Sequence, residues 1–372
     1  MKILYVITGL GVGGAERQVV DVVDRLADLG HSVKIAYLTG PKLTTPASKN
    51  IDLIGFRMTK GPMGFAIAYV NLRKLIIEFS PDVVHSHMVH ANLLCRLIRL
   101  TCRMQKLVCT AHNSNEGGAM RMWGYRLTAP LANVTTNVSA EAVSAFEAKG
   151  AVAAGTMLAI CNGIDTQRFR PSAVTRGKLR QKHGVSSTDK VILAVGRLNE
   201  AKDYPNLLNA FSIVLQSSES VHLWIVGDGD LRQELMSQVN SLGMQHKVCF
   251  MGVQNNVEEW MNAADVFVLS SAWEGFGLVV AEAMACEKVV VATDAGGVKE
   301  VLGDCGFLVP TRDPVALSNA LKNALSLDQS VALEMGVQAR KRVVSLYSIE
   351  NVVERWLNVY GLAGAHFDLK KP

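Results

Sequence analysis

The sequence lacks the cysteine patterns and the long apolar runs that would mark a disulfide-rich, zinc-binding or membrane-spanning protein. Its seven cysteines are scattered, form no CxxC pair and do not cluster with histidine, so we expect reduced thiols. No apolar run approaches the ~20 residues that a membrane-spanning helix needs. The apolar segment at residues 3–7 is too short for a signal peptide and is followed at once by glycines. We therefore expect a soluble or peripheral protein made in the cytoplasm.

Apolar residues are plentiful, at 49% of 372, and charged residues make up 19%, which favours a folded chain of about two domains. The net charge of +5 is unevenly distributed. Residues 1–165 carry 17 lysines and arginines against 11 acids, whereas residues 166–372 carry 21 against 22. The first half is therefore expected to face an anionic partner, which on charge alone could be phosphate, lipid or nucleic acid.

Short apolar runs typical of buried strands alternate with helical patterns through both halves of the chain. In the first half the runs lie at 3–8, 32–38, 82–85, 107–111, 133–138 and 156–160. In the second half they lie at 190–196, 221–227, 247–252, 265–269, 288–291 and 306–309. Because strands buried on both faces and separated by helices form parallel sheets, the pattern predicts two doubly wound, Rossmann-like α/β domains in tandem.

The division between the two domains is predicted near residue 165. The stretch 162–187 opens with an Asn-Gly turn signal and contains Pro171 and many polar residues. We therefore assign residues 1–165 to an N-terminal domain and residues 166–348 to a C-terminal domain. A helical pattern at 349–360 follows the last strand of the second domain, so we expect the C-terminal segment 349–372 to pack back on the first.

A glycine-rich loop follows the first predicted strand. The segment from Gly9 to Glu16 reads GLGVGGAE and contains GxGxxG, the dinucleotide-binding pattern. That function needs an acid at the end of the second strand, and residues 36–40 contain none. The loop is therefore expected either to let the amides near Gly13 and Gly14 approach a phosphate, or to serve only as a tight turn between strand and helix.

Two cations follow the first strand of the second domain. Arg197 comes directly after that strand, and Lys202 stands at the start of the next helix. Ligands of doubly wound domains bind outside the carboxyl ends of the strands, where two cations would suit a diphosphate. The alternative is an ordinary surface pair beside Glu200 and Asp203.

Two carboxylates bracket the start of a predicted helix in the segment from Glu274 to Glu282, which reads EGFGLVVAE. Acids in apolar surroundings need hydrogen-bonding partners, and the hydroxyl groups of a sugar are suitable ones. The alternative for Glu282 is an ordinary acid near the start of a helix, stabilised by the helix dipole.

Metal binding is not favoured by the remaining acids and histidines. Asp228 and Asp230 form an Asp-x-Asp pair, but they follow a strand at a place where a turn is expected. His85, His87 and His90 lie near a strand end without the carboxylate spacing of a metal site.

His112 has a more informative position than the other histidines. It directly follows the strand predicted at 107–111, at the same edge of the sheet as the glycine loop. This edge favours contact with a ligand over a purely local role in the loop.

Taken together, these segments resemble the retaining glycosyltransferases of family 4, which have the GT-B fold of two Rossmann-like domains facing across a cleft. The resemblance covers nearly the whole chain and is carried by the order and spacing of its motifs. These are Gly13-Gly14-Ala15-Glu16, Thr110-Ala111-His112, Asn162-Gly163-Ile164-Asp165 with Phe169, Gly196-Arg197-Leu198 with Lys202, Val226-Gly227-Asp228-Gly229, Glu274-x7-Glu282 and Gly296-Gly297-Val298-x-Glu300. One departure is Asp203, where the family often has glycine.

The resemblance implies how the donor diphosphate is bound. Arg197 and Lys202 would hold it, with help from the amides near Gly13 and Gly14. Fixed cations and helix N-termini would stabilise the negative charge of the leaving diphosphate, so neither a metal nor another cofactor is implied.

The resemblance also implies roles for residues around the transferred sugar. Glu274 would hold its hydroxyl groups, Glu282 would bind the ribose of the nucleotide, and His112 would contact the sugar near its reacting carbon. Glu16 would lie on the acceptor side. Backbone groups would assist Glu274 at Phe276, Gly277 and Leu278.

The substrates implied by the resemblance are a nucleotide sugar and a saccharide acceptor, with no nucleic acid. The donor would carry a hexose or N-acetylhexosamine, with UDP as the commonest nucleotide. The acceptor would be linked to a polyprenyl lipid in the synthesis of a bacterial surface polysaccharide, lipopolysaccharide or O-antigen. The alternative on the same fold is a sugar-nucleotide 2-epimerase, although the Glu-x7-Glu segment favours transfer. A two-domain binding protein of the periplasmic kind would need a signal peptide, which is missing.

One segment of the first half mixes basic and apolar residues. Residues 91–106 contain Arg96, Arg99, Arg103 and Lys106 among several leucines. A single helix of this composition is expected either to lie on an anionic membrane surface or to pack its leucines on the sheet. The lipid-linked acceptor favours the membrane, so we expect a peripheral location on the inner face of the cytoplasmic membrane.

Overall fold

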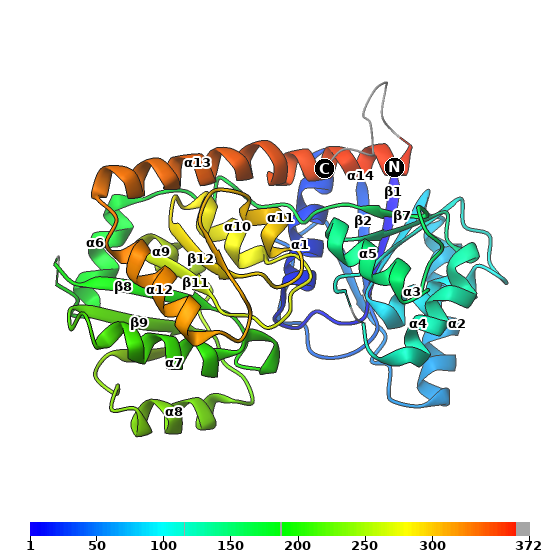
Figure 1. Ribbon diagram of the computed structural model, residues 1–372. Coiled ribbons are helices and arrows are strands. Elements are labelled where there is room, and N and C mark those ends of the chain that lie inside the picture. The colour runs from blue at the N-terminus through cyan, green and yellow to red at the C-terminus, as the bar shows by residue number, and fades with distance from the viewer. Residues whose placement is uncertain (115, 187, 362–372) are drawn as a thin grey trace. The chain divides into compact units, whose positions relative to one another are not determined.

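The computed structural model describes residues 1–114, 116–186 and 188–361 (Figure 1). Contacts within the chain divide it into two compact units. The first comprises Met1–Gly163 together with the C-terminal segment from Ile349, and the second comprises Ile164–Ser348. Each unit is built on a parallel sheet of its own.

The sheet of the first unit has seven parallel strands in the order β3-β2-β1-β4-β5-β6-β7. They are β1 (Lys2–Ile7), β2 (Ser32–Tyr37), β3 (Asp52–Gly55), β4 (Val83–His87), β5 (Lys106–Thr110), β6 (Val134–Asn137) and β7 (Met157–Ala159). The order reverses at β1, because β2 and β4 pair with it on either side. Such a reversal is the switch point at which doubly wound domains bind ligands.

The sheet of the second unit has six parallel strands in the order β10-β9-β8-β11-β12-β13. They are β8 (Lys190–Val195), β9 (Val221–Val226), β10 (Val248–Gly252), β11 (Val266–Leu269), β12 (Val289–Thr293) and β13 (Phe307–Val309). Here the order reverses at β8, between β9 and β11. The predicted doubly wound architecture is confirmed in both units.

One strand was not predicted from the sequence. All six apolar runs of the second half are strands, but the first sheet contains β3 in addition to the predicted six. β3 lies at the edge of the sheet beside β2, and none of its four residues is buried. A short edge strand that is open to water needs no apolar run, so the sequence pattern does not reveal it.

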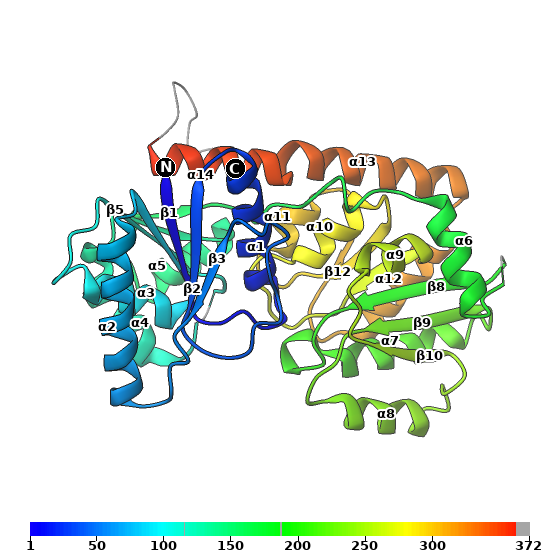
Figure 2. The ribbon, with the colours of Figure 1, turned by 180° about the vertical axis from the view of Figure 1, so that it is seen from behind.

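Helices cover both faces of the first sheet (Figures 1 and 2). The helices α1 (Gly14–Asp28) and α14 (Ile349–Tyr360) pack on one face, and α2 (Pro62–Phe79) and α3 (Val89–Ile98) pack on the other. The unit is completed by α4 (Gly118–Thr128), a short 3₁₀ helix (Ala129–Leu131) and α5 (Ala140–Ala148).

The second unit begins and ends with helices. They are α6 (Ala173–Lys182), the 3₁₀ helix η2 (Glu200–Lys202), α7 (Tyr204–Leu215), α8 (Arg232–Ser241), α9 (Val257–Ala263), α10 (Leu278–Ala285), α11 (Val298–Leu302), α12 (Pro314–Leu325) and α13 (Gln329–Tyr347). In the described part of the chain, no helix combines the length and the apolar character that crossing a membrane requires.

The C-terminal helix α14 shares the core of the first unit. Its buried residues Val352, Val353 and Trp356 pack with apolar residues of α1 and β1. At its end, the Tyr360 hydroxyl lies 2.7 Å from the Tyr5 hydroxyl of β1. The amphipathic pattern at 349–360 is therefore explained by burial against α1 and the first sheet.

The segment predicted to lie on a membrane is built differently. The helix α3 ends at Ile98, and Lys106 already belongs to β5. Arg96 is fully buried, donates to the backbone oxygen of Tyr125 and to the Thr135 hydroxyl, and lies over the Tyr125 ring. The prediction that residues 91–106 form a basic membrane-docking helix is therefore wrong, because the helix ends at Ile98 and Arg96, in its last turn, is buried in the protein.

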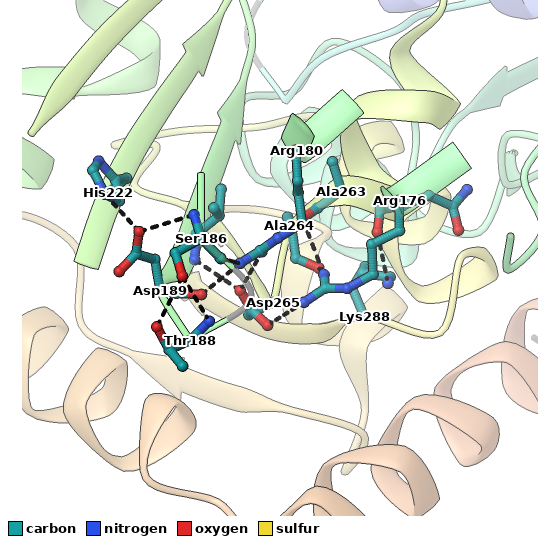
Figure 3. Close-up of polar contacts among 12 residues, drawn as sticks. Arg176, Arg180, Ser186, Thr188, Asp189, His222, Ala263, Ala264, Asp265 and Lys288 are labelled. Carbon is teal, nitrogen blue, oxygen red and sulfur yellow. Dashed lines mark hydrogen bonds and ion pairs between the residues drawn. The ribbon is translucent and has the colours of Figure 1, made fainter. Parts of the chain in front are cut away.

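The chain enters the second unit through α6, which is held to the sheet by one carboxylate (Figure 3). Asp265, just before β11, accepts hydrogen bonds from Arg176 at 2.7 Å and from Arg180 at 3.1 Å. It also accepts one from the backbone N–H of Val191 at 2.8 Å. Asp265 thus joins α6, β8 and β11, and the two arginines leave it little contact with water.

We expect Asp265→Asn to lower the free energy of unfolding of the second unit by about 3 kcal/mol, because it leaves two guanidinium groups without their carboxylate. Chemical denaturation followed by circular dichroism measures the change. Asp304→Asn, at an exposed carboxylate of the same unit, is the matched control. Equal stability of the two variants would contradict the importance of this cluster.

Candidate active site

The glycine-rich loop leads from β1 into α1 at the switch point of the first sheet. A side chain at Gly13 would collide with Glu16, whose carboxylate oxygen lies 2.5 Å from the place of a Cβ atom. Glu16 therefore folds back over the loop, and a side chain at Gly13 would require the flexible end of Glu16 to move. The acid also stands in the first turn of α1, where the helix dipole favours negative charge.

His112 follows β5, and its ring is buried beside His87 of β4. His112 Nε2 and His87 Nδ1 are joined by a hydrogen bond of 2.9 Å. Burial lowers the pKa of His112 to about 4 and also lowers the pKa of His87. Both imidazoles are therefore neutral at pH 7, and one ring donates its N–H to the other.

His87 belongs to a column of buried rings between β1 and β4. Its ring stacks on Tyr5 and lies 4.1 Å from the ring of His85, between centroids. His85 contacts the Tyr360 hydroxyl at 2.6 Å and the Thr110 hydroxyl at 2.7 Å, and burial lowers its pKa. The histidines of β4 are thus neutral polar groups of the core. Among the described residues, no cluster of three or more histidine, cysteine or acidic side chains could hold a metal ion.

Glu116, which sequence reasoning missed, supports the loop that carries His112. One carboxylate oxygen accepts from the His112 backbone N–H at 2.8 Å, and the other accepts from the Tyr125 hydroxyl. Asn92 of α3 donates to that hydroxyl at 2.9 Å, and burial raises the pKa of Glu116. Glu116 stands four residues after His112, but Tyr125 and Asn92 meet it only in the fold, so the sequence carries no signal for the cluster.

A small cavity lies beside these rings. It is lined by His87 and His112 and by Gln18 of α1, among other residues of the first unit. The Gln18 side-chain oxygen accepts from the Gly163 backbone N–H at 2.8 Å. Within the described residues, Gln18 Nε2 and His87 Nε2 have no hydrogen-bond partner. Buried polar atoms are seldom left unpaired, so this cavity is suited to a small polar guest such as water.

In the second unit, Lys202 and Glu274 form an ion pair of 2.5 Å at the switch point of the sheet. Ser271 donates to the same carboxylate oxygen at 2.7 Å, and Ser270 donates to the Lys202 backbone oxygen at 2.7 Å. The loop after β8 and the loop after β11 are therefore tied together by side chains. Sequence reasoning selected both charged residues, but it did not predict that they pair.

Arg197 is exposed at the end of β8, where the backbone is closely packed. A Cβ atom at Gly227 would lie 2.0 Å from the backbone oxygen of Gly196, and one at Gly229 would lie 2.4 Å from that of Leu198. The loop after β9 can approach the loop of Arg197 only because both positions are glycine. These glycines thus set the place from which Arg197 projects.

Asp203, where the chain departs from the family pattern, has a backbone conformation that glycine would also adopt. It adopts the left-handed conformation, with φ +45° and ψ +48°, which glycine enters most readily. Aspartate is among the few other residues that enter this region. Glycine at position 203 would therefore give the same backbone conformation directly after Lys202.

The pair Asp228 and Asp230 belongs to a turn, as the sequence indicated. Asp228 Oδ1 accepts from the Gly229 backbone N–H at 2.8 Å and lies 3.8 Å from an Arg232 side-chain nitrogen. The Asp228 carboxylate therefore stabilises the turn that leads into α8.

Glu282 lies within α10, which begins at Leu278, so it is not in the first turn of the helix. The simple account of Glu282 as an acid at the helix start is thus not supported. Gly277, just before the helix, has φ +83°, and a Cβ atom there would lie 2.9 Å from Val298 Cγ2. The Phe276 ring is buried and meets the Tyr347 ring edge-on, so the side chain of Phe276 supports the loop.

The predicted residues thus form two groups, one at the carboxyl edge of each sheet. Gly13, Gly14, Glu16 and His112 belong to the first unit. Arg197, Lys202, Glu274 and Glu282, with the segment 276–278, belong to the second. Within the second group, Lys202 and Glu274 are in direct side-chain contact.

The pKa of His112 gives a direct test of the first group. We expect its imidazole to stay neutral until the pH approaches about 4, because burial disfavours the charged form. The unfolded chain takes up this proton near the ordinary pKa of about 6.5, so the free energy of unfolding should fall as the pH decreases from there. NMR titration of ¹⁵N-histidine-labelled protein, with His112→Gln to assign the signal, measures the pKa. Titration of His112 near its ordinary value would contradict this account.

Two family models match the chain. "Glycosyltransferase Family 4" matches residues 12–168, and "Glycosyl transferases group 1" matches residues 175–342. The first match contains the site residues of the first unit, and the second match contains those of the second unit.

Several known proteins are similar over most of their length. EpsD of Bacillus subtilis, provisionally assigned as a glycosyltransferase, is 29% identical over 80% of this chain and 81% of its own. An uncharacterised glycosyltransferase of Methanocaldococcus jannaschii is 30% identical over 76% and 75%. The UDP-Gal:α-D-GlcNAc-diphosphoundecaprenol α-1,3-galactosyltransferase of Escherichia coli is 26% identical over 78% of each chain.

A solved structure also shares the fold. HepE of Anabaena, crystallised with UDP and glucose, superposes with a TM-score of 0.83 at 22% identity, covering 96% of this chain and 99% of HepE. The two family models together match most of the chain, which therefore belongs to the GT4 family of retaining glycosyltransferases, and its two parallel α/β sheets are those of the GT-B fold.

Proposed function

We propose that this glycosyltransferase moves a hexose or N-acetylhexosamine from a UDP-sugar to a saccharide carried on a polyprenyl lipid. The observation that carries the proposal is the Lys202–Glu274 pair at the switch point of the second sheet. A cation and a carboxylate side by side can bind a diphosphate and a sugar in one place. HepE binds UDP and glucose on the same fold, and the Escherichia coli relative is named for a UDP-sugar and a diphosphoundecaprenol-linked acceptor.

The leaving diphosphate is held in this proposal by Arg197 and Lys202. Cleavage of the bond between sugar and phosphate places negative charge on the diphosphate, and fixed cations stabilise that charge in the transition state. Lys202 is well placed because Glu274 and the Ser270 contact fix its position before a donor arrives. Arg197 is exposed and can reach a ligand without breaking up the core.

Glu274 and Glu282 bind hydroxyl groups in this proposal. Glu274 keeps one carboxylate oxygen on Lys202 and Ser271, and its other oxygen can accept from the transferred sugar. Glu282 is nearly buried within α10 and takes the ribose hydroxyls. Backbone groups of Phe276, Gly277 and Leu278 complete the sugar site.

His112 acts as a neutral hydrogen-bonding group toward the donor sugar. Because its pKa is lowered to about 4, the His112 imidazole is uncharged at pH 7. His112 therefore orients the sugar through a hydrogen bond and not as a cation. Attack of the acceptor hydroxyl on the face of the leaving group retains the anomeric configuration, and the leaving phosphate takes the hydroxyl proton. No pair of carboxylates spaced as in glycosidases is then needed. Gly13 and Gly14 assist the diphosphate, and Glu16 lies on the acceptor side.

The pathway proposed for this transfer is synthesis of a bacterial surface polysaccharide at the inner face of the cytoplasmic membrane. A sugar-nucleotide 2-epimerase remains the competing function on this fold. Incubation with a UDP-sugar alone separates the two, because an epimerase converts the sugar without an acceptor. Epimerised UDP-sugar in that mixture would reverse the choice.

We expect Arg197→Ala and Lys202→Ala each to lower the turnover of sugar transfer by about 10²–10³, the effect of removing one group that stabilises transition-state charge. Lys341→Ala, at an exposed lysine of α13, is the control and should keep normal turnover. Turnover within a few-fold of the natural enzyme in both site variants would refute the diphosphate assignment.

We also expect excess chelator to leave transfer largely intact, because Arg197 and Lys202 supply the positive charge that a metal supplies in other transferases. The measurement is the initial rate before and after dialysis against EDTA. A complete loss of activity that manganese or magnesium restores would show that Asp228, Asp230 or other acids bind a required metal.

A further inference from the structure

The helix α2 is apolar on the side that faces water as well as on the side that faces the sheet. Ala68, Leu72 and Ile76 are buried against the first sheet. The opposite side exposes a stripe at helical spacing, whose apolar members are 51% to 74% exposed. These members are Met63, Ile67, Val70 and Ile77. A surface helix normally has a polar outer face, so this stripe is expected to contact something other than water.

The helix α4 repeats this feature. Met120, Trp123 and Leu127 recur at helical spacing and are between 61% and 89% exposed. The helix α3 contacts both α2 and α4 and thus links these two helices in the first unit (Figures 1 and 2). We call the exposed apolar residues of α2 and α4 (Met63, Ile67, Val70, Ile77, Met120, Trp123 and Leu127), together with the exposed cations Lys74, Arg121 and Arg126, the outer surface.

The charge of the outer surface is positive. Lys74 interrupts the α2 stripe, and Arg121 and Arg126 flank the apolar residues of α4, all three exposed. Glu78, which lies 3.7 Å from Lys74, is the one exposed acid on α2 and α4 within the described residues. Apolar side chains interspersed with cations suit the headgroup region of an anionic bilayer, where tryptophan is also favoured.

We propose that the outer surface docks the protein on an anionic lipid membrane. Pairing with a second copy of the chain is disfavoured, because the same face on both copies would bring like charges together. The membrane contact predicted from the sequence involved Arg96, which is buried, whereas the contact proposed here is made by exposed residues of α2 and α4. It agrees with the proposed lipid-linked acceptor but does not depend on it, because lipid binding is measured without sugar transfer.

Sedimentation with vesicles tests the proposal. The full chain should sediment with phosphatidylglycerol-containing vesicles at low salt, and much less with pure phosphatidylcholine vesicles or at high salt. Joint Arg121→Gln and Arg126→Gln substitution should lower the partition coefficient about 30-fold, since each cation near the headgroups contributes about 1 kcal/mol. Joint Ile67→Glu and Val70→Glu substitution should also reduce binding. Leu333→Glu, at a 61% exposed leucine of α13, is the matched control.

Three results would overturn the proposal: no binding to anionic vesicles at low salt, unchanged binding by both double variants, or self-association that the same variants abolish. Thermal unfolding of each variant shows whether a loss of binding arises from misfolding. Transfer to a water-soluble acceptor distinguishes this proposal from the proposed function. Loss of lipid binding with normal transfer supports docking by this surface, whereas absence of transfer in the natural enzyme contradicts only the proposed function.

Discussion

The central strands of both sheets run parallel to their neighbours and are buried on both faces. Polar side chains that bind a ligand are therefore carried by the loops at the carboxyl ends of the strands. Every paired strand has its carboxyl end at the same edge, and the order reverses at β1 and at β8. His112 follows β5, Arg197 follows β8 and Glu274 follows β11, so distant parts of the sequence reach these two edges. Glycines then allow close approach, as at Gly227, where a Cβ atom would collide with the Gly196 backbone.

Much of this architecture could be predicted because it rests on local patterns. Apolar runs separated by helices located every strand except β3, whose exposed edge position removes the pattern. The segment 91–106 was misread for a related reason, because composition does not tell which side of a helix a residue faces. Arg96 is buried and donates hydrogen bonds to oxygens of Tyr125 and Thr135, and these contacts arise only when distant parts of the chain meet in the fold.

The candidate site was predictable as a set of residues but not as a set of contacts. Lys202 and Glu274 stand 72 positions apart, and only the pairing of β8 with β11 brings their loops together. Glu116 was missed because its partner Tyr125 lies on a helix whose position the sequence does not specify. The neutral state of His112 likewise follows from burial beside His87, which is a property of the assembled core.

The central claim is that the second unit binds the nucleotide sugar through Lys202 and its neighbours. Thermal unfolding in the presence of UDP-, GDP-, ADP- and dTDP-sugars tests it most directly, because a ligand that binds the folded state raises the unfolding temperature. The account predicts a rise with a UDP-sugar that is lost in Lys202→Ala and Glu282→Gln. A rise of equal size in those variants, or no rise with any nucleotide sugar, would contradict it.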